Sequence, residues 1–370
     1  MKKNKNKDGF SRKQFLMSAG GTLLGGGLLT SLGFPKAAKA STTEPLSKQI
    51  NSSVAQPRGI HRVAADPTKL PPPITRKTPK TIHVELEATE IIGEIEKGVK
   101  FHYMTFGNQI PSPFIRVRQG DTVIFTLKSS DFNVYLHNID FHAVYGTGGG
   151  ANATYVTPGT SETIKFKALY PGAFMYHCAV PGMDHHISAG MYGMIFVEPE
   201  EGLPKVDHEF YIGQNEIYTD GDSSGLGIYP FDFDKMKAEN PSYVLLNGEV
   251  GALSDSGRGA IKVKKGETAR IFFVNGGPNL MSHLHPIGNV FTRAWREGAV
   301  LNTPEQYLQT IAVPPGSCAV LDMDFPVPST IHLVDHALSR VMYKGMGGEI
   351  VVEGTPDKSI YDPDYKLDSK

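Results

Sequence analysis

An internal repeat constrains the fold of this chain more than any other feature of its sequence. Three short patterns occur in the first half and return, in the same order, in the second half. They are VRQGDTVIF at 117–125 and VKKGETARIF at 263–272, VTPG at 156–159 and VPPG at 313–316, and GMYGMIFVEP at 190–199 and GMGGEIVVEG at 345–354. The copies lie 146, 157 and 155 residues apart, measured from the first residue of each pattern. A preserved order at a nearly constant spacing indicates two copies of one structural unit.

Each copy is predicted to be a β-sandwich. Short runs rich in β-branched residues, such as TIHVELEA at 81–88 and TVIFTL at 122–127, are separated by Gly, Pro and Asn at the intervals typical of antiparallel sheets. At 370 residues the chain is long enough for two domains with sizeable cores. We therefore expect an all-β fold with tandem domains at 81–203 and 204–356, followed by a tail at 357–370.

The first 80 residues have a different composition. Residues 1–40 combine lysines near the start, an apolar stretch at about 15–34 and the small-x-small sequence AKA at 38–40, which together indicate an export signal cleaved after residue 40. Within it, SRKQFL at 11–16 resembles a twin-arginine signal with Lys in place of the second Arg. This predicts a periplasmic or other extracytoplasmic location, the alternative being a retained membrane anchor. Residues 41–80 are polar and proline-rich, so we expect an extended arm or linker that buries little apolar surface.

Charge and cysteine content argue against a nucleic-acid-binding protein and against a fold held together by disulfides. The 37 Lys and Arg residues balance 38 Asp and Glu residues, for a formal net charge of -1. No basic face is implied, so we expect no nucleic-acid partner. Two cysteines cannot form a disulfide framework. Cys318 lies in an apolar run and is expected to be a small buried strand residue.

Potential metal ligands are concentrated between residues 136 and 191. Five of the thirteen histidines lie there with one of the two cysteines and a methionine: His137, His142, His177, His185, His186, Cys178 and Met191. Successive residues of a β-strand point to opposite faces, so the adjacent His177 and Cys178 suit two metal ions better than one. His137 and His142 are five positions apart, and this odd offset also places them on opposite faces of an extended segment. The cluster therefore predicts two metal centres.

The first predicted centre is His137, Cys178, Met191 and a histidine about eight residues after the cysteine. Two imidazoles, one thiolate and a weak axial methionine are characteristic of blue-type electron-transfer copper, the type 1 centre. Spacing alone leaves His185 and His186 as competitors for the second imidazole. The second predicted centre, with the remaining histidines of the cluster, lacks a third ligand.

These motifs closely resemble those of the copper-containing nitrite reductases. HNIDFHA at 137–143, YHCAVPGM at 176–183 and HISAGM at 186–191 carry the likeness, which extends from about residue 80 to residue 354. The resemblance implies that each repeat is a cupredoxin-like Greek-key β-sandwich, that each subunit holds two copper ions, and that the substrate is nitrite. The loop after Cys178 is one residue shorter than the commonest family form. We choose His186 because it preserves the family's His-x4-Met spacing.

The resemblance also supplies the missing ligand of the second centre. VDH at 334–336 resembles the family stretch that carries the third ligand of the catalytic, type 2 copper. We therefore expect His142, His177 and His336 to hold that copper. Three imidazoles without a thiolate can leave one coordination position open for a small molecule. The peptide between Cys178 and His177 would be a short covalent path for the electron.

Nitrite reduction also requires protons and partners. Forming nitric oxide and water consumes one electron and two protons, and Asp140, together with His285 in SHLHPIG at 282–288, matches the family's proton-delivering residues. His283 and His332 are expected to be structural. The resemblance implies a homotrimer with the type 2 copper at subunit interfaces. A cytochrome c or a small cupredoxin would be an equally suitable electron donor.

Two other functions compete with a nitrite reductase. A multicopper oxidase requires a His-Cys-His core and several His-x-His pairs, but Ala179 follows Cys178, and the one His-x-His is His283-Leu284-His285. An electron-transfer cupredoxin, a binding module without catalysis, would need only the type 1 ligands. That function leaves the other histidines of the cluster unexplained.

Overall fold

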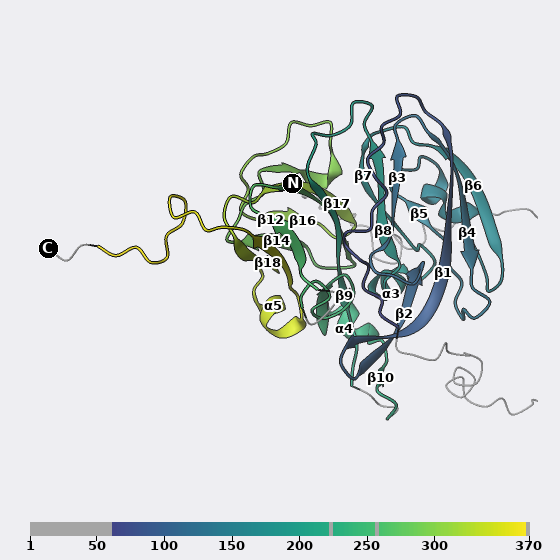
Figure 1. Cartoon of the computed structure of the whole chain (residues 1–370). Coiled ribbons are helices and arrows are strands. Elements are labelled where there is room, and N and C mark those ends of the chain that lie inside the picture. Colours follow the sequence, from purple (N-terminus) through teal and green to yellow (C-terminus); the bar gives the residue numbers. More distant parts are fainter. Residues whose placement is uncertain (1–60, 222–224, 256–258, 368–370) are drawn as a thin grey trace, which may run out of the picture. The chain divides into compact units, whose positions relative to one another are not determined.

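The structure is a computed structural model that describes residues 61–221, 225–255 and 259–367 (Figure 1). The predicted export signal and residues 41–60 of the predicted arm lie outside the described residues. Within the described ranges, no helix is both long enough and apolar enough to span a membrane.

The first sandwich consists of two sheets, with strand orders β10-β2-β1-β4-β6 and β3-β8-β7-β5. Its strands are β1 (Thr81–Glu96), β2 (Val99–Phe106), β3 (Ser112–Arg118), β4 (Thr122–Ser129), β5 (Asp140–Phe141), β6 (Ser161–Lys167), β7 (Gly172–His177), β8 (Tyr192–Glu198) and the short β10 (Ile228–Tyr229). In β4, Val123, Phe125 and Leu127 are buried and alternate with more accessible residues. This is the alternation expected of a strand with one face toward the core.

The second sandwich also consists of two sheets, with strand orders β11-β9-β13-β17-β15 and β12-β19-β18-β14-β16. Its strands are β9 (His208–Ile217), β11 (Tyr243–Leu246), β12 (Ile261–Lys264), β13 (Thr268–Gly277), β14 (Ser282–Ile287), β15 (Arg293–Trp295), β16 (Ile311–Val313), β17 (Ser317–Asp324), β18 (Ser329–Asp335) and β19 (Gly348–Glu353). Cys318 lies buried in β17, as predicted.

Equivalent strands pair in the same way within each sandwich, in keeping with the sequence patterns that occur in both. In the first, β3 pairs in parallel with β8, and β4 pairs with β1 in parallel and with β6 antiparallel. In the second, β12 pairs in parallel with β19, and β13 pairs with β9 in parallel and with β17 antiparallel. Parallel neighbours far apart in sequence require crossover connections. The predicted all-β fold of two tandem Greek-key sandwiches is confirmed.

The connections contain only short helical segments among the described residues. They are η1 (Thr147–Ala153), α3 (Met183–Ser188), α4 (Phe233–Lys237), η2 (Arg296–Gly298) and α5 (Ser339–Lys344). The two sandwiches belong to one compact unit. The larger hydrophobic core includes residues of both, and Phe272 of the second sandwich packs with ring-centroid distances of 4.9 Å against Phe114 and Phe196 of the first.

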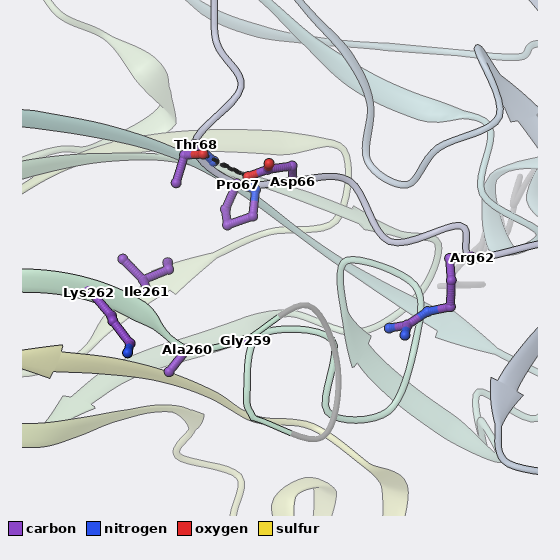
Figure 2. Close-up of a pocket in the computed structure, with 8 residues that line it drawn as sticks. All are labelled: Arg62, Asp66, Pro67, Thr68, Gly259, Ala260, Ile261 and Lys262. Atoms are coloured by element: carbon purple, nitrogen blue, oxygen red, sulfur yellow. Dashed lines mark hydrogen bonds between the residues drawn. The ribbon is translucent and has the colours of Figure 1, made fainter.

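The described part of the N-terminal arm buries more apolar surface than its composition suggests. Val63 and Ala64 are completely buried, and their backbone N–H groups donate to Glu249 Oε1 at 2.6 and 3.0 Å. Farther along, the arm forms one wall of a hollow whose other wall is the segment 259–262 (Figure 2). None of the predicted metal ligands lines this hollow.

Candidate metal centres

The first group of donor atoms comprises His137, Cys178 and His186. Cys178 Sγ lies 3.5 Å from His186 Nδ1 and 3.9 Å from His137 Nδ1, and all three residues are buried. Met191 is completely buried, and its backbone N–H donates to His186 O at 3.0 Å. Two imidazole nitrogens and a thiol that converge in a buried site fit a soft transition metal such as copper.

Burial sets the protonation of the first group. It raises the pKa of Cys178 to about 11. Burial, together with the neighbouring His137 and His185, lowers the pKa of His186 to about 3. Without a metal, the group is therefore a neutral thiol beside neutral imidazole. A bound metal cation would displace the thiol proton and balance the negative charge of the resulting thiolate.

The two competing histidines occupy different places. Both lie in α3, which follows the turn after Cys178. His185 packs its ring against Phe231 at a centroid distance of 4.2 Å, whereas His186 faces the cysteine sulfur. The structure therefore brings the residue that we chose, His186, into the first group and leaves His185 outside it.

The second group comprises Asp140, His142 and His177. Asp140 in β5 is paired directly with His177 in β7. His142 Nε2 lies 3.0 Å from His177 Nε2, and His177 Nε2 lies 4.0 Å from Asp140 Oδ2. Two imidazole nitrogens that share one metal at ~2.0–2.1 Å, with an angle between 90° and tetrahedral, lie about 3 Å apart. The arrangement therefore fits a metal ion.

The orientation of these rings is fixed from outside the group. His177 Nδ1 lies 3.0 Å from the carbonyl oxygen of Cys178, and the backbone of Gly316, from the second sandwich, hydrogen-bonds His142. Neighbouring protein atoms exclude water from the His142 ring and so lower its pKa, although part of this residue remains accessible to solvent. The neighbouring His177 lowers it further, and Asp140 opposes both effects only in part. His142 is therefore neutral at neutral pH and can act as a ligand.

A glycine segment confines the Asp140 carboxylate. Gly149 has φ +55°, and a Cβ atom added there would lie 1.8 Å from Asp140 Oδ1. Only glycine fits at this distance, because any side chain would push the carboxylate aside. The sequence analysis did not identify this contact. A run of glycines in a loop indicates a turn, but not which side chain it approaches.

His336 and His285 lie on the second sandwich. His336 is exposed directly after β18, and its backbone N–H donates to His283 O at 2.8 Å. Its ring centroid is 5.2 Å from that of His285, whose Nδ1 lies 2.6 Å from the carbonyl oxygen of Gln309. In Figure 1, β14 and β18 lie well away from β5 and β7. Within one chain, the described residues thus do not bring His336 together with His142 and His177.

The remaining histidines of interest have ordinary partners. His283 Nδ1 lies 3.4 Å from Asp335 Oδ1, and His332 Nδ1 lies 3.7 Å from Glu349 Oε1. Neither belongs to a metal-binding group among the described residues. One buried residue that the sequence analysis missed is Glu90, which contacts His137. A single glutamate in a strand that also carries Glu85, Glu87, Glu94 and Glu96 gives no signal of its role.

Comparisons with known proteins identify relatives of this chain. The sequence model of a family described as multicopper oxidase matches residues 87–202. The copper-containing nitrite reductase of Neisseria meningitidis serogroup B is 44% identical over 301 residues, covering 81% of this chain and 76% of that protein. The copper-containing nitrite reductase of Cereibacter sphaeroides is 34% identical over 319 residues, covering 79% and 84%. The solved copper nitrite reductase of Nitrosomonas europaea superposes with a TM-score of 0.67 at 33% identity, covering 75% of this chain and 95% of that one. By these matches, the chain belongs to the family of copper-containing nitrite reductases.

Proposed function

We propose that the protein binds copper and reduces nitrite to nitric oxide and water, using one electron and two protons. The observation that carries this proposal is the position of two consecutive residues at the end of β7. His177 belongs to the second group and Cys178 to the first, so a single peptide joins the two donor sets. A carrier protein would not need such a link between two sites.

Each donor set suits one role. His137, Cys178, His186 and Met191 would hold a type 1 copper, which would take up and pass on a single electron. His142, His177 and His336 would hold a type 2 copper, whose chemistry would be Lewis-acid polarisation of nitrite and one-electron transfer to it. The protein's own contribution is to orient the imidazoles through backbone carbonyl contacts and to leave one position open.

Asp140 and His285 would deliver the two protons. Asp140 stands beside the nitrogen that His177 directs toward the metal position. If His285 Nδ1 donates its proton to Gln309 O, Nε2 is left free to exchange a proton with a ligand. A carboxylate on one side and an imidazole on the other would allow one proton to be delivered from each.

The assembly that fits these positions is a homotrimer with shared type 2 sites. His142 and His177 lack a third imidazole within their own chain, while His336 and His285 are a pair on the other sandwich without a metal partner of their own in the described ranges. In a closed ring, the first sandwich of one subunit can meet the second sandwich of the next. Such a ring would complete three sites.

The proposal extends to export and to the electron donor. The signal-like N-terminus supports export, and N-terminal sequencing of the mature protein tests it: a chain that still begins at Met1 would contradict cleavage after Ala40. The electron donor would be a cytochrome c or a small cupredoxin. Mixing each reduced donor with the enzyme and following its oxidation by absorbance distinguishes them.

An anaerobic assay tests the proposed reaction. Copper-loaded protein, a chemical reductant and nitrite should release nitric oxide, and electron paramagnetic resonance should show two distinct copper signals. A single type 1 signal without nitric oxide would favour an electron carrier. A coupled copper pair with oxygen consumption would favour a multicopper oxidase.

A further inference from the structure

Glu90 is a buried carboxylate beside the first group. It lies in β1, and its side chain is only 2% exposed. Its Oε1 accepts hydrogen bonds from the backbone N–H of Val134 at 3.0 Å and of Tyr135 at 2.7 Å, and lies 3.0 Å from His137 Nε2. One oxygen atom therefore holds both the ring of a proposed copper ligand and the segment that leads to it.

The second carboxylate oxygen is less enclosed by donors. Oε2 lies 3.5 Å from Nε2 of His102, whose side chain is 37% exposed. Three N–H donors converge on the buried Oε1, and hydrogen bonds of this kind favour the ionised form of a carboxyl group. Glu90 is therefore a negatively charged carboxylate with little contact with solvent.

We propose that Glu90 is a positioning residue of the type 1 copper centre, which fixes the His137 ring and lowers the reduction potential of the bound copper. The inference rests on the proposed function, because it requires copper at the first group. Glu90 belongs to neither proposed ligand set, so its contribution is separate from coordination of the copper.

The positioning follows from the hydrogen bond. A carboxylate accepts only, so His137 Nε2 must carry the proton and donate it. The lone pair of the ring then lies on Nδ1, the atom that faces Cys178 Sγ at 3.9 Å. Ligating histidines are commonly held in this way by a carboxylate on the far nitrogen, which fixes the tautomer and increases ligand basicity.

The effect on the potential follows from charge. Cu(II) is more positive than Cu(I), so a fixed negative charge one imidazole away stabilises the oxidised ion more than the reduced ion. Because the carboxylate is buried, solvent ions screen this interaction little. Removing the charge while keeping the hydrogen bonds should therefore raise the potential.

The substitution Glu90→Gln, in the copper-loaded full-length protein, separates charge from shape. The glutamine Oε1 can accept the same three hydrogen bonds, so the intense thiolate-to-copper absorption should remain. The Cu(II)/Cu(I) equilibrium should shift toward Cu(I) by at least about tenfold, which is about 59 mV for a one-electron couple. Electron transfer from the first to the second centre should slow accordingly, because the first copper holds its electron more tightly.

Glu87→Gln is the matched control. Glu87 is exposed on the same strand and carries the same charge, so its substitution should leave the potential unchanged. Glu90→Ala removes the hydrogen bonds as well as the charge, and should weaken copper retention at the first site and alter the absorption spectrum. These changes should be smaller in Glu90→Gln.

The outcomes separate this inference from the proposed function. If Glu90→Gln and wild-type protein have equal potentials while both show the type 1 absorption, the inference is wrong and the proposed function stands. An equal shift in Glu87→Gln would also overturn it, because the effect would then be one of net charge. If the copper-loaded wild-type protein shows no type 1 absorption, the proposed function fails and the inference fails with it.

Discussion

Mixing two inactive variants tests where the catalytic site is assembled. His142→Ala removes an imidazole from the second group, and His336→Ala removes the exposed imidazole of the second sandwich. Every site in either homotrimer lacks one ligand, so each variant alone should lack nitrite reduction. In a mixed trimer, a His336→Ala chain still offers His142, and a His142→Ala neighbour still offers His336. Some sites should therefore become complete.

The expected recovery follows from the geometry of a closed ring. Each shared site takes its first half from one chain and its second half from the neighbour. In an equal mixture with free exchange, an intact His142 is present in about half of the first positions and an intact His336 in about half of the second. About one quarter of the sites should be complete, and activity should return to about one quarter of the wild-type value.

Dilution of wild-type chains with an inactive variant is an independent test of the shared site. The double variant, His142→Ala with His336→Ala, is mixed in equal amount with wild-type chains, and nitric oxide release is measured in trimers isolated by two different tags. Among trimers that carry both tags, shared sites predict about one sixth of full activity, whereas sites built within one chain predict about one half. Verified mixed trimers without any recovery in the first experiment, or with half activity in the second, would refute the shared site.

Five further substitutions test the roles of individual residues. Cys178→Ala should abolish the intense visible absorption and stop turnover with a donor that enters at the first copper, while the second copper stays bound; full colour would reject the thiolate ligand. His186→Ala should damage the first site far more than His185→Ala, whose ring only packs against aromatic neighbours; equal damage, followed by copper content and absorption, would contradict the geometry. Asp140→Asn should leave both coppers bound and lower the rate of nitrite reduction by about 10²- to 10⁴-fold, and near-normal activity would return Asp140 to a structural role. Gly149→Ala should displace the same carboxylate and so give a similar loss with an altered pH profile, and adding it to Asp140→Asn should cause little further loss of activity.

The fold could be predicted from the sequence because the repeat and the strand pattern carry the same information. The copies around 117–125 and 263–272 contain strands that pair in the same way in both sandwiches. The predicted sorting of the potential ligands into two groups rests on a related property of strands. At the end of β7, His177 and Cys178 point to different groups, as the alternation of a strand requires.

Other features depend on contacts that the sequence does not contain. His185 and His186 lie in a short helix, where neighbouring residues differ in direction by about 100°, so spacing alone could not decide between them. The separation of His336 from His142 depends on how the two sandwiches pack. Glu90 was missed because its partners come from a segment more than forty residues away, and the burial of Val63 because a polar, proline-rich composition predicts a solvated arm.

The aromatic contact between the sandwiches has a consequence for how freely either half can vary. Phe114 and Phe196 of the first copy and Phe272 of the second form part of one core. Separating the copies would expose these rings to water, and large exposed apolar patches favour association or aggregation. The two sandwiches have equivalent strand orders, but each depends on the other to keep these rings buried. A substitution at one of these rings therefore has to fit side chains of both sandwiches.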